Sequence, residues 1–256
     1  AITLDHGTQN HEIDQPFEMI VPLVANKHVC FNTLSRERYQ KYLEKNKESF
    51  FYIDRKNLIL ENCNGGLYKK IYLNNNPKRI FKKKKNLKIL ISGYPQSHWV
   101  QPELPEYHFY EKIFLELEIA KFLKSYGAET FYKIHPDRNY GDLIKLYKQN
   151  YSKVITTRFE KLNLKKFDAI IHTYILGRPF MYSLMKDIPL ILIDNDLKNW
   201  ENQESKKLLK DRCKIVNYFH QISGPNFDKY RFEKILDEIK NGEVQYNFEY
   251  IKHNLN

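Results

Sequence analysis

The residues whose types and spacing best suit chemistry surround His135. An apolar strand pattern over residues 131–134 stops at His135 and Pro136, with Lys133 and Arg138 on either side. Proline fixes its own φ and favours an extended backbone in the residue before it, so we expect this imidazole at the carboxyl end of a strand. In an open α/β sheet, that edge binds ligands. The pattern predicts an anion site, and a histidine satisfied by backbone groups is the structural alternative.

A second candidate follows the apolar strand pattern of residues 168–172. Thr173 and Tyr174 come directly after it, and Gly177 and Arg178 precede a proline that suits the first turn of a helix. Free N–H groups at a helix start and a guanidinium are both good phosphate donors, so this loop predicts a phosphate cradle. The alternative is an ordinary loop in which Arg178 faces solvent.

Two further candidate sites contain acidic residues. Asp5 and His6 follow a short strand pattern at residues 2–4, and a carboxylate beside an imidazole is able to supply a general base. Asp194 and Asp196 form the one acidic pair at a credible strand end, which keeps a metal-dependent alternative open. The three cysteines are widely spaced and offer no CxxC pair, which argues against both a disulfide framework and a zinc site. We assign no metal ligands and expect no cofactor.

Strand and helix patterns alternate beyond residue 86, as in a doubly wound parallel sheet. We expect a Rossmann-like nucleotide-binding domain over residues 87–256, and Gly93, which ends its first strand, is assigned to the nucleotide-phosphate site. The expected strands are residues 87–92, 130–134, 153–157, 168–172 and 190–193, and the expected helices are 107–126, 142–150, 180–186 and 226–240.

The first third of the chain has weaker patterns. Residues 1–76 predict a smaller, partial α/β region, with a helix that begins at Ser35 as N-cap and a strand over residues 68–73. Residues 77–86 are rich in lysine and poor in apolar side chains, so they predict a basic linker between two domains.

Charge implies anionic partners. The formal net charge is +11 and the isoelectric point is about 9.3. The run of Lys82, Lys83, Lys84 and Lys85 is either a solvated linker or a basic segment that binds anionic lipid electrostatically. Nucleic acid ranks third, because no aromatics interleave with these lysines and no RNA-binding motif accompanies them. Without a long apolar run or a signal-peptide pattern, we expect a cytoplasmic protein. The lipid-binding alternative for the lysine run would add a peripheral contact with the inner face of the membrane.

The order of these motifs resembles one family. Asp5-His6-Gly7, then His135-Pro136, then Asp168 to Thr173 and Asp187-Ile188-Pro189 are similar to bacterial surface-polysaccharide transferases of the two-Rossmann, or GT-B, type. These include CMP-dependent sialyl-, polysialyl- and Kdo-type transferases and CDP-glycerol glycerophosphotransferases. The resemblance implies that Asp5 or His6 is the catalytic base. It also implies that His135, Pro136 and the loop from Thr173 to Arg178 hold the nucleotide and its phosphate.

Three departures from the family pattern stand out. Gly177 and Arg178 replace a pair of hydroxyl residues, and Tyr182 occupies the place of an acidic residue that suits ribose. The family's first Rossmann domain also precedes the Asp-His-Gly loop with about 100 residues or more, a typical domain length. Only four residues precede that loop here. The chain is therefore expected to be the C-terminal part of a longer protein or to have a reduced front half.

Two functions follow as expectations. The first is a transferase that moves a sugar, or a polyol phosphate, from a cytidine nucleotide to a bacterial surface glycan or glycolipid of a capsule or lipopolysaccharide. A CMP-activated acidic sugar is the expected donor. The second is a non-catalytic Rossmann-like module that binds anions or docks on a membrane as part of a larger assembly.

Overall fold

The computed structural model describes ten stretches of the chain. The described residues are 2–4, 27–45, 58–63, 66–73, 81–93, 109–136, 141–175, 178–193, 203–221 and 224–254.

The largest sheet of the described residues has six parallel strands. Its strands are β4 (Lys88–Ser92), β5 (Glu129–Lys133), β6 (Lys153–Ile155), β7 (Ala169–His172), β8 (Leu190–Ile193) and β9 (Lys214–Val216). They lie in the order β6-β5-β4-β7-β8-β9. The chain therefore moves outward from β4 to β6, then crosses to β7 on the other side of β4. This order is that of a Rossmann-like, doubly wound sheet, as the sequence predicted.

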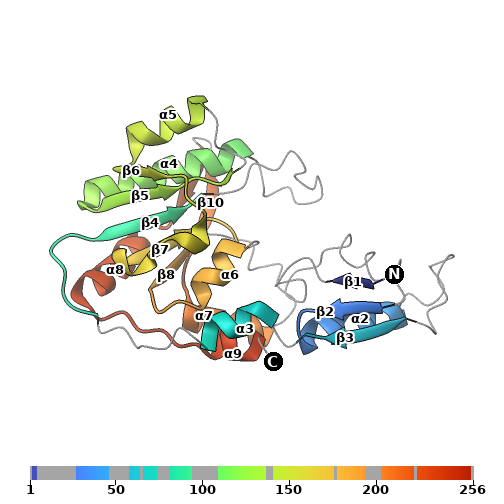
Figure 1. Cartoon of the computed structure of the whole chain (residues 1–256). Helices are drawn as coiled ribbons and strands as arrows, with labels where there is room; N and C mark the ends of the chain where they lie inside the picture. The colour runs from blue at the N-terminus through green and yellow to red at the C-terminus, as the bar shows by residue number, and fades with distance from the viewer. Residues whose placement is uncertain are drawn as a thin grey trace.

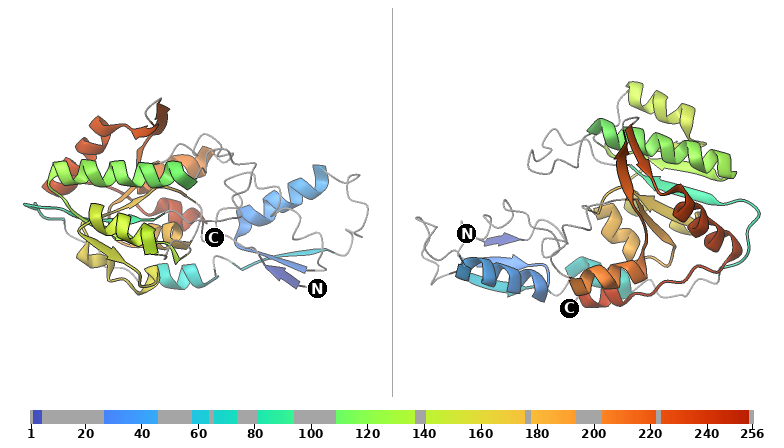
Figure 2. Two further views of the ribbon diagram at one scale, coloured as in Figure 1. Left: turned by 90° about the horizontal axis from the view of Figure 1, so that it is seen from above. Right: turned by 180° about the vertical axis from the view of Figure 1, so that it is seen from behind.

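Helices cover both faces of this sheet (Figures 1 and 2). One face carries α4 (Phe109–Tyr126), α5 (Gly141–Asn150) and α8 (Lys229–Asn241). The other carries α6 (Arg178–Leu184), α7 (Gln203–Arg212) and α9 (Glu249–Asn254), with the short 3-10 helices η4 (Phe159–Lys161) and η5 (Leu164–Lys166).

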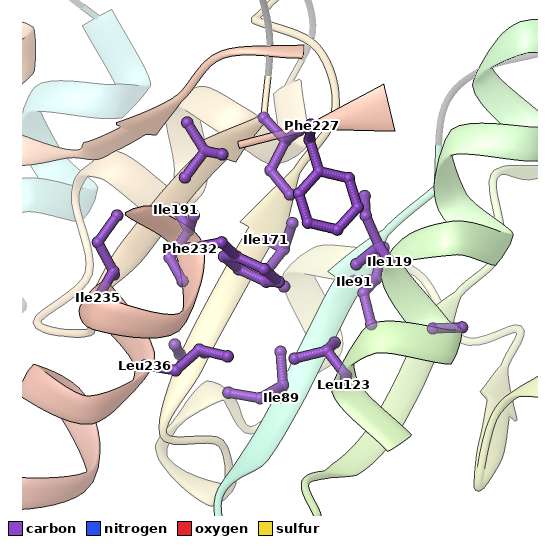
Figure 3. Close-up of a cluster of buried hydrophobic side chains, with 14 of the residues drawn as sticks. Ile89, Ile91, Ile119, Leu123, Ile171, Ile191, Phe227, Phe232, Ile235 and Leu236 are labelled. Atoms are coloured by element: carbon purple, nitrogen blue, oxygen red, sulfur yellow. The ribbon is translucent and has the colours of Figure 1, made fainter. Parts of the chain in front are cut away.

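Alternation along the strands sorts the core into two clusters. Ile89, Ile91 and Ile171 pack under α4 and α8, where Phe227 and Phe232 also lie (Figure 3). Leu90 of β4 and Ile170 of β7, which alternate with these residues along the strands, point to the opposite face and pack under α6. Both faces of each central strand are buried, which explains why these strands read as continuous apolar runs.

A small parallel sheet, in the order β1-β2-β3, lies beside the large one. It consists of β1 (Ile2–Leu4), β2 (Lys27–Cys30) and β3 (Ile59–Asn62), and α2 (Thr33–Lys45) packs on β2 and β3. Helix α3 (Gly66–Leu73) follows β3 in the sequence but packs with the core on the α6 side of the large sheet. Figure 1 shows this small sheet beside the N-terminus, which the letter N marks. Phe31, just after β2, packs in the core cluster under α6.

Two expectations for this region are wrong. Residues 68–73 belong to helix α3, and Ile71 and Tyr72 turn toward the α6-side core, with the Tyr72 ring 6.0 Å from that of Phe248. Apolar pairs four residues apart suit a helix better than a strand. The cap of α2 is Asn32 rather than Ser35, because the Asn32 side chain accepts the Ser35 backbone N–H at 2.8 Å.

The helix expected at residues 226–240 is shorter at its start. Residues 224–227 form β11 (Gly224–Phe227), which pairs antiparallel with β10 (Tyr218–Gln221). Asp228 then caps α8 by accepting the Arg231 N–H at 2.9 Å. The buried residues of α8 are the four expected from the apolar period, Phe232, Ile235, Leu236 and Ile239.

The basic run packs against the end of the sheet where the strands begin, the amino edge. Phe81 contacts the α4-side core, the Lys84 N–H donates to Lys240 O at 2.8 Å, and the Lys84 ammonium lies 3.5 Å from Asp168. Lys82, Lys83 and Lys85 are exposed. In the described part of the chain, no helix is long and apolar enough to cross a membrane.

Candidate functional site

The candidate site is the opposite end of the large sheet, the carboxyl edge, where β4 lies between β5 and β7. The chain leaves β4 toward one face and leaves β7 toward the other, so the two connections part and leave a place for a ligand. Ser92 pairs in register with Lys133 on one side and with His172 on the other. The residues that follow these three strands therefore share one edge.

His135 lies where the sequence predicted. Strand β5 ends at Lys133, and His135 is half-buried two residues later, followed by the exposed Pro136. Lys133 itself is almost buried and donates a hydrogen bond to Ile134 O. Burial lowers the pKa of this lysine, and the carboxylate of Glu160 partly opposes that effect. Arg138 lies outside the described residues.

Thr173 and Tyr174 are also at this edge, and both are buried. The Thr173 carbonyl accepts a hydrogen bond from Lys112 Nζ at 2.8 Å. Among the described residues, the Thr173 hydroxyl has no hydrogen-bond partner. A buried hydroxyl without a partner is costly, which marks this strand end as a place where a polar ligand would be stabilised.

Lys112 is a site residue that sequence reasoning missed. It is buried on the inner side of α4, and its ammonium lies 4.6 Å from the ring centroid of Tyr218. Glu116, one turn later, is buried too and accepts hydrogen bonds from the hydroxyls of Tyr132 and Tyr147 at 2.8 and 2.9 Å. A lysine and a glutamate four residues apart on the apolar face of a helix were the available signal.

His172 is a second residue that the sequence did not single out as a ligand-binding group. It ends β7 and is fully buried, with its Nε2 3.0 Å from the Ser183 hydroxyl of α6. Desolvation lowers its pKa to about 3, so the imidazole is neutral at physiological pH.

Gly93 directly follows β4, and its N–H donates to Lys133 O at 2.9 Å. A Cβ at this position would lie 2.7 Å from Cζ of Tyr132 and 2.9 Å from Lys133 O. The protein's own packing therefore requires glycine here. Its assignment to a phosphate site stays a prediction.

The phosphate loop is partly described. Arg178 is the first residue of α6 and is exposed, while Gly177 lies outside the described residues. The helix begins two residues earlier than predicted, so Pro179 lies within its first turn. The Pro179 carbonyl accepts the Ser183 hydroxyl at 2.7 Å.

Asp5, His6, Asp194 and Asp196 lie outside the described residues, so the structure does not place the predicted base or the acidic pair. Strand β1, which precedes Asp5, pairs parallel with β2 up to the contact of Leu4 with Val29. In the ranges that the structure covers, no three His, Cys, Asp or Glu side chains gather closely enough to hold a metal ion.

Comparisons with known proteins give few matches. No protein-family model and no curated protein matches this chain. Four chains of solved structures match, among them the beta Kdo 2,7 transferase KpsC of Thermosulfurimonas dismutans. The identity to that transferase is 11%, over 75% of this chain and 78% of the other, and the TM-score is 0.30. A TM-score this low carries no weight for fold or function.

Proposed function

We propose that this chain is a nucleotide-sugar-dependent glycosyltransferase that binds a cytidine nucleotide at the carboxyl edge of the large sheet. One observation supports this most. The register of β4, β5 and β7 brings Gly93, His135 and Thr173, three motif residues far apart in sequence, to one edge at the switch point of a Rossmann-like sheet. The expected acceptor is a bacterial surface glycan or glycolipid.

The cations at this edge suit the departing nucleotide. As the acceptor oxygen bonds to the anomeric carbon of the donor, the bond from that carbon to the phosphate oxygen breaks, and CMP leaves with the electron pair. Hydrogen bonds from His135, Lys133 and Arg178 would stabilise the growing phosphate charge. Asp5 or His6 is proposed to take the acceptor's hydroxyl proton. This mechanism uses no cofactor.

A membrane contact is proposed for the other end of the domain. The exposed Lys82, Lys83 and Lys85 lie at the amino edge, away from the candidate site. An anionic membrane bound there would leave the carboxyl edge accessible to donor and acceptor.

Calorimetry with CMP, CDP, UMP and AMP tests the nucleotide site. We expect CMP or CDP to bind to the wild type, and His135→Ala to weaken binding by about 10- to 100-fold, as for loss of a hydrogen bond to a charged group. Lys124→Ala is the control, because Lys124 is exposed near the amino end of the sheet. Absence of heat with every nucleotide, or equal binding by His135→Ala, would favour the non-catalytic module.

A further inference from the structure

The buried imidazole of His172 has one nitrogen that none of the described residues hydrogen-bonds. His172 is the last residue of β7, paired with Ser92 of β4 and Leu192 of β8. Its ring lies 5.1 Å from that of Phe180 and 6.2 Å from that of Phe159, measured between centroids. In the part of the chain that the structure describes, Nδ1 has no hydrogen-bond partner.

Neighbouring bonds determine which nitrogen carries the proton. The Ser183 hydroxyl has a single proton, and it donates that proton to Pro179 O at 2.7 Å. Ser183 Oγ must therefore accept from His172 Nε2, which lies 3.0 Å away. A neutral imidazole carries one N–H, so Nδ1 is an acceptor with a free lone pair.

The support for Ser183 is itself rigid. Arg212 of α7 is fully buried and donates to the carbonyls of Ser183 at 3.2 Å and Leu184 at 2.8 Å. It also donates to Lys186 O at 2.6 Å. These bonds hold the end of α6, and through Ser183 they hold the orientation of the His172 ring. Such support is what a preorganised binding group requires.

The chemistry of Nδ1 selects its ligand. A phosphate oxygen is also an acceptor and would be repelled, whereas a hydroxyl would satisfy a desolvated lone pair that is otherwise costly to bury. A nucleotide at a switch point presents ribose hydroxyls, and the described edge offers cations for its phosphate at Lys133 and Arg178.

We infer that His172 binds a ribose hydroxyl of the nucleotide through Nδ1, and that Ser183 is the residue that positions it. The inference rests on the proposed nucleotide site. The inference assigns recognition of the ribose to His172, at the end of β7 on the α6 side. Recognition of the phosphate is left to Lys133 of β5 and Arg178 of α6.

Two substitutions separate this role from a structural one. His172→Gln keeps a polar atom near Nε2 for Ser183 but has no acceptor at the depth of Nδ1, whereas His172→Asn places an amide oxygen there and loses the Ser183 bond. We expect His172→Gln to weaken CMP binding about tenfold or more, the size of one hydrogen bond, and His172→Asn to weaken it less. A purely structural histidine predicts the reverse order, which would overturn the inference.

Deoxy analogues identify the ligand group. The wild type should bind CMP about tenfold more tightly than one of the two analogues 2′-deoxy-CMP and 3′-deoxy-CMP, namely the one that lacks the hydroxyl bound by Nδ1. His172→Gln should abolish that difference. If both analogues bind the wild type as CMP does, a water molecule satisfies Nδ1 and the inference fails. If the variant loses its preference for CMP over UMP instead, the base amine is the donor and the ribose assignment is overturned.

Nitrogen-15 NMR of His172 in the full chain tests the geometry without any nucleotide. We expect the proton on Nε2, and a proton on Nδ1 would overturn the inference even if CMP binds. Failure of CMP to bind the wild type would instead overturn the proposed function, so the two failures are distinguishable. If His172→Gln does not fold by circular dichroism, the wild-type analogue series and the tautomer spectrum still decide.

Discussion

The Tyr132 side chain occupies the space into which a Cβ on Gly93 would project. Its ring carbon Cζ lies 2.7 Å from that position, and its hydroxyl donates to Glu116 Oε2 at 2.8 Å. The glycine at the end of β4 and the buried tyrosines under α4 are therefore one packing unit.

Gly93→Ala should lower the free energy of unfolding by about 1–3 kcal/mol, because a methyl group would overpack against Tyr132. Tyr132→Phe removes the hydroxyl and should cost less in the Gly93→Ala background than in the wild type. Urea unfolding of the four proteins measures this coupling. Gly141→Ala is the matched control, since a Cβ there meets none of the described residues within 4 Å, and it should be neutral or stabilising. Simple additivity of the two substitutions would contradict the packing unit.

Arg212 should be among the most sensitive residues in the chain. Its guanidinium is fully buried and donates to four carbonyls, those of Ser183, Leu184, Lys186 and Ile188. Burial lowers its pKa to about 10, which still leaves it charged at neutral pH. Arg212→Lys keeps a charge but loses the planar set of donors, so we expect a loss of about 3 kcal/mol or more in urea unfolding. Retention of wild-type stability would show that these bonds contribute little.

Acid should destabilise the fold through His172. The pKa of an unperturbed histidine is 6.5, and burial lowers the pKa of His172 to about 3 in the folded protein. Between these values the unfolded chain binds a proton that the folded chain does not, so the free energy of unfolding falls as pH drops, by up to about 1.4 kcal/mol per pH unit. Thermal unfolding from pH 7 to 4 should show a smaller pH dependence in His172→Gln. Parallel curves for the two proteins would rule this out.

Lys112 should matter for stability although it is a lysine. Lys112→Met leaves the Thr173 carbonyl without this donor, and we expect a loss of about 1–3 kcal/mol in urea unfolding. Lys124→Met, on the exposed side of the same helix, should change stability by less than about 0.5 kcal/mol. Equal effects of the two substitutions would mean that the bond to Thr173 is not stabilising.

The thiols should differ in reactivity. Cys63 is exposed, whereas Cys30 and Cys213 are buried, and desolvation raises the pKa of Cys213 to about 12. A thiolate is the reactive form, so a thiol reagent at pH 8 should modify Cys63 in the native protein and all three cysteines after unfolding. Cys63→Ser should remove the fast phase. A fast phase that survives this substitution would contradict the burial of the other two thiols.

Local patterns predicted the elements whose signal is strong. The continuous apolar runs of β4, β7 and β8 and the period of α8 follow directly from residues such as Ile170 and Phe232, because burial on one or both faces imposes those patterns. The same reasoning failed at residues 68–73, where the segment is too short for its four-residue spacing of apolar side chains to outweigh its strand-like composition, and helix α3 packs its Tyr72 ring against Phe248.

The Rossmann-like domain and the places of His135 and Thr173 just after strands were predictable from the chain alone, because proline, glycine and apolar runs act locally. Long-range packing was needed to show that Lys112 reaches Thr173 and that Ser183 orients His172. Those contacts join residues 61 and 11 positions apart in the chain, and no local pattern encodes which buried polar atoms meet. Which nitrogen of His172 is available to a ligand is likewise a property of the packed fold.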